Sequence, residues 1–217
     1  MSLDTTHANR RMTHFDGHDS IWLFGYGSLI WKADFPYHER RPAYIYGWDR
    51  RFWQGSHDHR GTPEAPGRVV TLIRRPDAIC YGMAYRIGPE VLGSLDVREK
   101  NGYLREIVTL HFLPTASETS SRTASPTRSQ AETHHTSTAE RDEGLVYLAG
   151  QDNAAFLGDA PHGVIAEQIA RAHGPSGPNR DYLLNLAASL EAMGVEDPHI
   201  RELVHHLPAT PPLETPR

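Results

Sequence analysis

The sequence predicts an α+β fold, because its strand-like segments come first along the chain and most of its helical segments come last. Six segments before residue 150 combine apolar runs or apolar alternation with turn residues at their ends. Three later segments repeat apolar residues at intervals of three and four, as amphipathic helices do. A chain of 217 residues can bury about 70% of its unfolded surface, so we expect one domain over residues 20–207.

The six expected strands differ in pattern but share short lengths and turn-forming boundaries. In the second strand, Tyr44, Tyr46 and Trp48 share one face, and residues 51–54 continue it after a bend. A Pro-Asp turn separates the third strand from the fourth. The expected strands cover residues 21–26, 43–48, 68–73, 80–87, 104–112 and 144–149.

Three helices are expected in the last third of the chain. Asp159 is placed to cap the first, with Pro161 near its start. The second covers residues 180–193, where the leucines recur at helical spacing. Asp197 and Pro198 open the third, since Asp is a favoured cap and Pro is tolerated in the first turn.

Three segments lie outside this pattern. Residues 1–19 are polar and are expected to form a flexible leader, and residues 208–217 a flexible tail. Residues 114–143 contain thirteen Ser or Thr among thirty and no apolar residue larger than Ala. Such a segment buries too little apolar surface to offset its ordering entropy, so we expect a disordered insertion within the domain.

The composition limits the classes of partner. A formal net charge of −5 argues against nucleic acid as the main partner. The single cysteine, Cys80, rules out an internal disulfide and fits a reducing compartment. No stretch reaches the length of a membrane helix, and the first twenty residues lack a secretory signal. We expect a cytoplasmic protein that binds neither nucleic acid nor membrane and requires no protein partner.

The segment Phe-Gly-Tyr-Gly-Ser-Leu follows the first expected strand. Gly27 lets a ligand approach the main chain closely, and Ser28 adds a hydroxyl. Backbone N–H groups of such a turn converge on an anion or a carbonyl oxygen. Glycines also flank aromatic residues at strand ends for packing alone, so this segment by itself leaves both interpretations open.

A short helix after residue 88 places an acidic residue at an unfavourable position. Glu99 lies in its last turn, one helical step after the apolar Leu95, and Gly102 provides the left-handed stop. A carboxylate at the negative end of a helix dipole is destabilising. It is either a solvated side chain held by Arg98 or Lys100, or a functional acid or base for which a local rule is broken.

Taken together, these segments resemble the ChaC family of γ-glutamylcyclotransferases, which act on glutathione. The resemblance covers about residues 20–207 with one interruption, and the order and spacing of the motifs is more specific than any one of them. The motifs are FGYGSLIW (24–31), RRFWQG (50–55), HRGT (59–62), PGRVVTL (66–72), VREKNGY (97–103), LVYLA (145–149), FLGDAP (156–161) and GPNRDYLL (177–184).

The resemblance implies a small mixed β-barrel of about six strands with flanking helices, a helical C-terminal third and a ligand at one mouth of the barrel. It also implies that Tyr26, Gly27, Ser28 and Leu29 grip the γ-glutamyl group. The family's catalytic glutamate falls on Glu99. The family usually has a much shorter link where residues 114–143 lie.

The implied reaction explains why one carboxylate suffices. The α-amine of a γ-glutamyl amide attacks its own γ-carbonyl, closes a five-membered lactam and expels the amine portion. For glutathione the products are 5-oxoproline and cysteinylglycine, and neither a cofactor nor a metal is required. A single carboxylate takes a proton from the ammonium and hands it to the departing nitrogen. We assign this role to Glu99.

Several residues are candidates for substrate binding. Arg51, Arg60 and Arg68 lie in matching motifs and suit the two carboxylates of glutathione. Tyr103 and Tyr147 have hydroxyls to offer. Each arginine has a surface ion pair as its alternative role, and each tyrosine a packed aromatic position.

Histidines do not indicate a metal site. Neither the pair His57 and His59 nor the pair His134 and His135 has a complete set of ligands at a known spacing.

Two alternatives stay open for the function. One is cyclotransfer on other γ-glutamyl amino acids or amines; the cationic and aromatic residues 51–61 favour a dipeptide tail instead. The other is a non-catalytic glutathione-binding module, which would dispense with Glu99. The glutamate in a full matching motif favours the enzyme.

Overall fold

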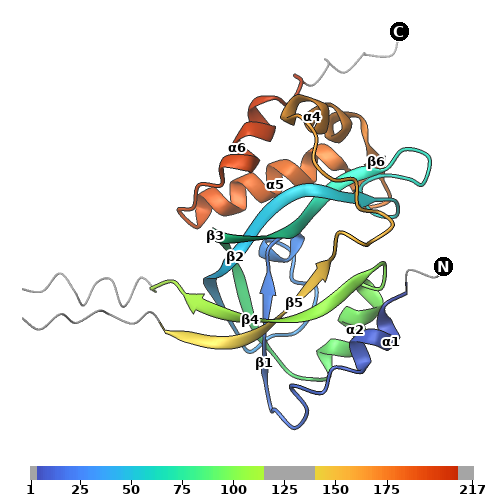
Figure 1. Ribbon diagram of the computed structural model, residues 1–217. Coiled ribbons are helices and arrows are strands. Elements are labelled where there is room, and N and C mark those ends of the chain that lie inside the picture. The colour runs from blue at the N-terminus through green and yellow to red at the C-terminus, as the bar shows by residue number, and fades with distance from the viewer. Residues whose placement is uncertain (1–3, 115–139, 210–217) are drawn as a thin grey trace, which may run out of the picture.

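A closed five-stranded barrel forms the centre of the molecule, with helices packed around it (Figure 1). The structure is a computed structural model that describes residues 4–114 and 140–209. The strand order is β1-β3-β2-β4-β5, and a parallel pairing of β1 with β5 closes an otherwise antiparallel sheet. The strands are β1 (Ile21–Gly25), β2 (Glu39–Ser56), β3 (Gly67–Ile87), β4 (Tyr103–Phe112) and β5 (Arg141–Ala149).

The barrel has five strands where about six were expected, because the third and fourth predicted strands are one long strand, β3. The expected Pro-Asp turn is instead a bulge: Tyr46 pairs with Ile79 and Trp48 with Arg74, so residues 75–78 of β3 lie opposite Gly47. Proline cannot donate to the ladder and is accommodated at such bulges. The strand residues 68–73 and 80–87 were predicted correctly, but their continuity in one strand was not.

The expectation that Tyr46 and Trp48 share one face of β2 is wrong, because the same bulge lies between them. Gly47 has φ +79°, a conformation that glycine adopts without steric cost, and the register shifts there. A shift of one residue exchanges the two faces of a strand. Tyr46 is therefore 53% exposed, whereas Trp48 is 3% exposed.

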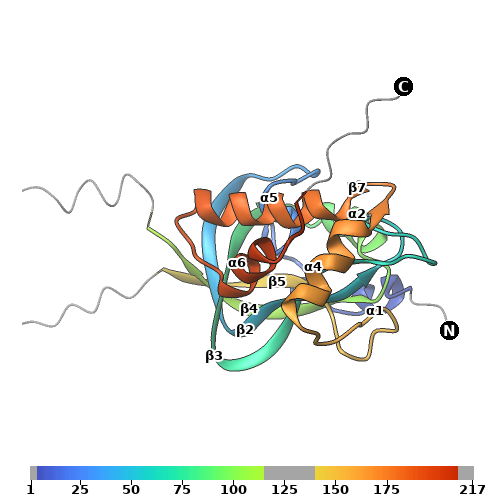
Figure 2. The same cartoon turned by 90° about the horizontal axis from the view of Figure 1, so that it is seen from above.

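The C-terminal helices follow the predicted order, and they lie together on one side of the barrel (Figure 1), in front of it in the view of Figure 2. Asp197 caps α6 as expected, accepting hydrogen bonds from the backbone N–H groups of His199 (3.1 Å) and Ile200 (3.2 Å). Asp159 does not cap α4, because that helix begins only after Pro161 and has no side-chain cap. The helices are α4 (His162–Arg171), α5 (Asn179–Ala192) and α6 (Pro198–His205), with the hairpin of β6 (His173–Gly174) and β7 (Gly177–Pro178) after α4.

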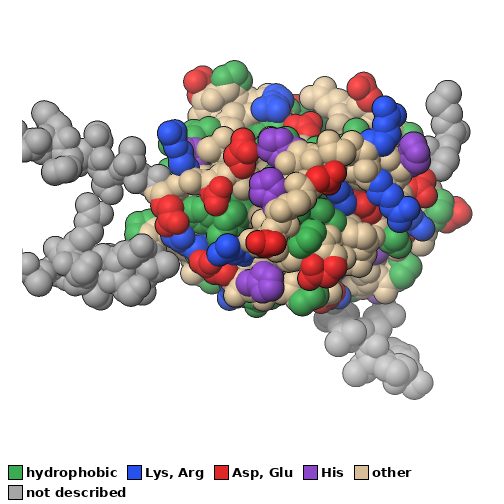
Figure 3. Space-filling view, turned by 90° about the horizontal axis from the view of Figure 1, so that it is seen from below, with side chains coloured by type: hydrophobic (Ala, Val, Ile, Leu, Met, Phe, Trp, Pro, Cys, Tyr) green, Lys and Arg blue, Asp and Glu red, His purple; other side chains and the backbone are tan. Residues whose placement is uncertain are grey.

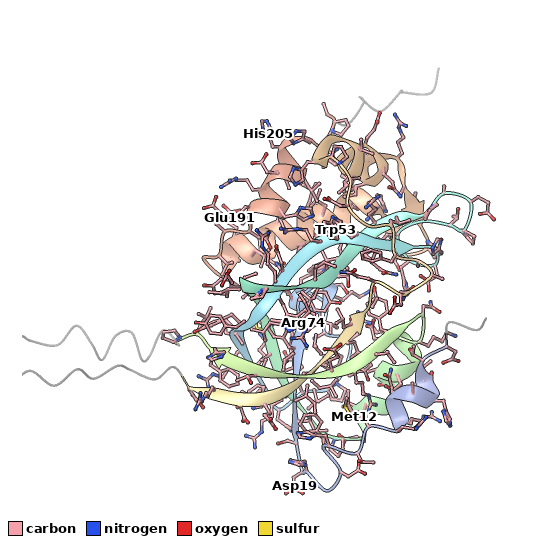
Figure 4. All side chains as sticks on the ribbon, in the orientation of Figure 1. Met12, Asp19, Trp53, Arg74, Glu191 and His205 are labelled. Atoms are coloured by element: carbon pink, nitrogen blue, oxygen red, sulfur yellow. The ribbon has the colours of Figure 1, made fainter. Side chains whose placement is uncertain are left out.

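The N-terminal segment packs against the barrel instead of hanging free. Residues Thr6–Arg10 form α1, and Asn9 is 2% exposed. The Asn9 side chain accepts a hydrogen bond from the Arg105 backbone (2.9 Å) and donates one to the Tyr103 carbonyl (3.0 Å). Met12, labelled in Figure 4, packs against the core. The segment therefore differs from the flexible leader that the sequence predicted, because a buried polar residue with satisfied hydrogen bonds holds it against the barrel.

The remaining expected segments lie mostly outside the described residues. This applies to the insertion expected at 114–143, of which Arg141 to Glu143 belong to β5, and to the tail expected at 208–217. Within the described ranges, no helix has the length and apolarity needed to cross a membrane. On the face opposite the C-terminal helices, acidic, basic and histidine side chains are interspersed (Figure 3).

Candidate active site

A small cavity of about 70 Å³ lies where the end of β1 meets α5 and the residue after α2 (Val91–Arg98). It contains the predicted glycine segment, the predicted acid and two predicted tyrosines. The fold thus brings together residues that are far apart in the sequence, such as Tyr26 and Tyr147, which are 121 positions apart. The lining residues are Phe24, Gly25, Tyr26, Gly27, Ser28, Leu29, Val70, Glu99, Tyr103, Tyr147 and Tyr182.

Close packing requires both glycines of the segment. A Cβ atom on Gly25 would lie 2.5 Å from the Leu29 Cβ atom, and one on Gly27 would lie 2.8 Å from the Tyr182 hydroxyl. Residues Ser28–Ile30 form the short 3-10 helix η1, which contacts α5, β1 and β3. The first N–H groups of such a helix have no acceptor inside it. The segment therefore presents backbone donors beside the cavity.

A methyl group at Gly27 is predicted to impair activity. In Gly27→Ala the added Cβ atom would also lie 3.0 Å from a methyl carbon of Val70 and would narrow the cavity. We expect kcat/KM to fall about 100-fold, since a displacement of about 1 Å has that effect on aligned groups. Gly150→Ala is the matched control, because no atom lies within 4 Å of the position that its methyl group would occupy. Equal kinetics for the two variants would contradict the role of this contact.

Glu99 occupies the cap position at the end of α2. Its N–H donates to the Leu95 carbonyl (2.8 Å), which fixes the backbone, and its side chain is 18% exposed. The Arg98 Nε atom lies 3.2 Å from the Glu99 Oε1 atom, and an Arg98 terminal nitrogen donates to the Ser28 hydroxyl (3.2 Å). One guanidinium thus connects the acid with the glycine segment.

The environment of Glu99 raises the pKa of its carboxyl above the ordinary value near 4.5. Burial is the largest cause, since it penalises the charged form. The Arg98 guanidinium opposes burial and lowers the pKa, while Asp58 adds to the increase. The sequence left open which effect would dominate; burial does, and a raised pKa suits a group that exchanges protons near neutrality.

Three tyrosines surround the acid with hydroxyls that stay protonated. Burial raises the pKa of Tyr26 and of Tyr103 well above 10, and that of Tyr182 to about 12. Tyr182, on α5, was not among the predicted site residues. The motif GPNRDYLL, which contains Tyr182, was a sequence signal for this residue. Helical spacing alone, however, predicts a core position for it.

The hydroxyl of Tyr147 is used in a buried network. It donates to the Asp96 carboxylate (2.7 Å), which also holds the Arg105 guanidinium through contacts of 2.9 and 2.7 Å. The Tyr147 carbonyl accepts from the Tyr26 hydroxyl (3.1 Å). Asp96 lies one turn before Glu99, so this network connects α2 and β5 with the glycine segment.

Two of the predicted arginines lie away from this cavity. Arg51 pairs with Asp49, with nitrogen–oxygen distances of 2.7 and 2.5 Å. Arg68 is buried and donates to the Gln168 side chain and to two backbone carbonyls. Their side chains are held by the protein itself. Arg60 differs, because its guanidinium lies 5.7 Å from the ring centre of Tyr182.

Among residues 4–114 and 140–209, no three His, Cys, Asp or Glu side chains come together as metal ligands do. His134 and His135 lie outside these ranges.

Comparison with known proteins identifies the family of this chain. A family model described as ChaC-like protein matches residues 21–210, which include every residue of the cavity. The chain belongs to the ChaC-like family. The motif-based resemblance is thereby confirmed.

Relatives in the ChaC-like family cover most of the chain. Gamma-glutamylcyclotransferase 2-3 of Arabidopsis thaliana is 42% identical over 196 residues, covering 87% of this chain and 88% of the relative. Glutathione-specific gamma-glutamylcyclotransferase 1 of Danio rerio is 41% identical over 202 residues, covering 89% and 92%. A crystal structure of a yeast γ-glutamylcyclotransferase specific to glutathione is 35% identical, with a TM-score of 0.74 and coverage of 88% and 96%. This likeness confirms the α+β barrel.

Proposed function

We propose that this protein is a γ-glutamylcyclotransferase that cleaves glutathione into 5-oxoproline and cysteinylglycine. The observation that carries the proposal is the buried Glu99 carboxyl beside the segment Tyr26, Gly27, Ser28 and Leu29 in one cavity. The names of the relatives in Danio rerio and Saccharomyces cerevisiae support glutathione as substrate. A retained acid in the cavity favours an enzyme over a glutathione-binding module.

The γ-glutamyl group binds first. The cavity is small beside the ~300–1,000 Å³ of pockets that enclose drug-sized ligands, so it takes one end of the tripeptide. The backbone N–H groups of Ser28 and Leu29 donate to the substrate's α-carboxylate or to the oxygen that becomes negative. Holding the amine over the γ-carbonyl is worth up to about 7–11 kcal/mol of the barrier.

Glu99 then transfers protons from the attacking nitrogen to the departing nitrogen. Its carboxylate takes a proton from the α-ammonium, and the free amine attacks the γ-carbonyl carbon. The C–N bond of the lactam forms, and the carbonyl π electrons move to the oxygen. When that oxygen restores the double bond, the amide bond to cysteine breaks and Glu99 returns its proton to the departing nitrogen. The ring nitrogen still carries two hydrogens after attack, and the Glu99 carboxylate passes one of them to the amine of cysteinylglycine, which becomes an ammonium. The lactam N–H and this ammonium together hold the four protons that the two substrate nitrogens held, and the carboxylate is regenerated.

The pH profile is predicted to report Glu99. The base must be ionised in the free enzyme, so kcat/KM falls as pH drops through its raised pKa, above 4.5. Because Arg98 lowers that pKa, Arg98→Gln is expected to move the acidic limb to higher pH. Lys100→Gln removes a neighbouring exposed cation as control. If the acidic limb of the pH profile lies at the same pH in Arg98→Gln as in wild type, the effect of Arg98 on the pKa of Glu99 is contradicted.

A substrate comparison tests the proposed function. Purified protein is incubated with glutathione, γ-glutamylalanine and ε-(γ-glutamyl)lysine, and 5-oxoproline is followed. We expect release from glutathione at the highest kcat/KM. Turnover of another substrate with glutathione left intact would replace this proposal with the broader cyclotransferase alternative.

The remaining expectations accompany this proposal. The reaction is an elimination of an amine without hydrolysis, which makes the enzyme a lyase. Cys80 is buried, and burial raises its pKa, so it is suited to a core position in a reducing cytoplasm. Catalysis by this scheme requires no cofactor, metal or partner protein.

A further inference from the structure

We propose that Arg60 determines the preference for glutathione by binding the glycine carboxylate of the leaving dipeptide. This inference rests on the proposed function and adds a residue to it. It concerns the portion of the substrate that the cavity does not enclose, and it separates a tripeptide from γ-glutamyl compounds that lack a carboxylate at that distance.

The loop 57–66 between β2 and β3 is held by hydrogen bonds on two sides. Asn101, two residues after the acid, donates a hydrogen bond to Asp58. On the other side, the Ser176 N–H donates to the His59 carbonyl (2.9 Å). These contacts fix the loop between the end of α2 and the hairpin before α5.

Arg60 is the arginine that this loop places near Tyr182, on the border of the cavity. Its guanidinium lies 5.7 Å from the ring centre of Tyr182, a lining residue, and one terminal nitrogen donates to the Pro178 carbonyl (3.1 Å). Its backbone N–H donates to the Ser56 hydroxyl (3.0 Å), so the position is anchored. The hydroxyl of the same tyrosine lies next to Gly27, so Tyr182 stands between Arg60 and the glycine segment.

The arginines beside the cavity residues already have partners, and so does Arg68, which lies farther away. Arg98 pairs with Glu99 and Arg105 with Asp96. Arg68 donates to an amide and two carbonyls. Among the described residues, no carboxylate lies within ion-pair distance of Arg60. Its remaining N–H donors are therefore available for a carboxylate, which guanidinium binds in bidentate geometry.

The length of the leaving dipeptide is compatible with a contact outside the cavity. Beyond the reacting carbonyl, two extended residues span about 7 Å. With the γ-glutamyl group beside Glu99 and Gly27, the glycine carboxylate extends beyond the cavity, and Arg60 lies near Tyr182, which lines that cavity. A γ-glutamylamine, which has no carboxylate there, forgoes this contact.

A chemical double-mutant cycle tests the inference. Wild type and Arg60→Gln are each assayed with glutathione and with glutathione esterified at the glycine carboxylate. We expect wild type to prefer glutathione about 10- to 100-fold in kcat/KM, the factor of a charge-assisted hydrogen bond. Arg60→Gln should abolish the preference by lowering only the glutathione value, and Arg60→Lys should retain part of it.

The control and the contrary results are distinct. Arg180, half-buried like Arg60, donates to the Pro208 carbonyl at 2.6 Å, so Arg180→Gln removes a similar contact elsewhere and should preserve the preference. An equal loss on both substrates in Arg60→Gln, or no preference in wild type, would overturn the role of Arg60 while cyclotransfer stands. Absence of 5-oxoproline from both substrates in wild type would overturn the proposed function itself, and this inference with it.

Discussion

Replacing Glu99 with Gln is expected to lower kcat by at least about 10²–10⁴-fold, the usual contribution of one acid–base group. The amide has nearly the shape of the carboxyl but neither accepts nor returns the proton at these steps. Because the same group performs both transfers, no second residue compensates. Glutathione affinity, measured by calorimetry on the variant, should change little, since the Tyr26–Leu29 segment is untouched.

A measurement of thermal stability distinguishes a loss of catalysis from a loss of folding in Glu99→Gln. A carboxyl whose pKa is higher in the folded protein than in the unfolded chain favours folding while protonated, and its ionisation costs stability as pH rises. Glu99→Gln removes that cost, so thermal unfolding at pH 8 should occur at the same temperature or higher. Glu191→Gln, on the exposed end of α5 (Figure 4), is the matched control and should retain full activity. Normal turnover by Glu99→Gln would assign the base elsewhere.

Replacing Asp96 with Asn is expected to cause the largest loss of stability, about 3–5 kcal/mol. The Asp96 side chain is 1% exposed and the Arg105 side chain 7% exposed, so the variant leaves a buried guanidinium without its counter-charge. The amide keeps only one acceptor oxygen, so its NH2 group faces either the Arg105 terminal nitrogen or the Tyr147 hydroxyl in place of an acceptor. Urea unfolding measures the change, with the midpoint moving to a lower concentration and an unchanged slope.

An exposed ion pair provides the comparison for this effect. Glu167 and Arg171 pair one turn apart on α4, and both side chains are more than half exposed. Glu167→Gln should change stability by at most about 0.5 kcal/mol, because solvent screens such pairs. If Asp96→Asn is no more destabilising than Glu167→Gln, the buried network does not hold α2 in place.

Much of this architecture is encoded locally and was therefore predictable. The caps and stops work through single residues, as Asp197 and the left-handed Gly102 demonstrate. The glycine segment and Glu99 were predicted because each departs from what packing alone favours, and the fold places them in one cavity. Barrel closure depends on the β1–β5 pairing between residues more than 120 positions apart, which periodicity cannot reveal.

The failures also have physical causes. The Pro-Asp signal at residues 76–77 marks a bend in either a turn or a bulge, and only the pairing of β2 with β3 decides which. Asn9 is polar, so its burial through hydrogen bonds to β4 has no sequence signature. Arg68 and Arg51 were grouped with Arg60 by motif, although only tertiary contacts reveal which guanidinium is already satisfied.

Isotope labelling tests intramolecular cyclisation most directly. Purified protein is incubated with glutathione in water enriched in ¹⁸O, and the products are identified by mass spectrometry. If the substrate's own amine attacks, 5-oxoproline and cysteinylglycine form in equal amounts and neither contains ¹⁸O from solvent. Free glutamate carrying one ¹⁸O atom would instead demonstrate attack by water and contradict a lactam-forming enzyme.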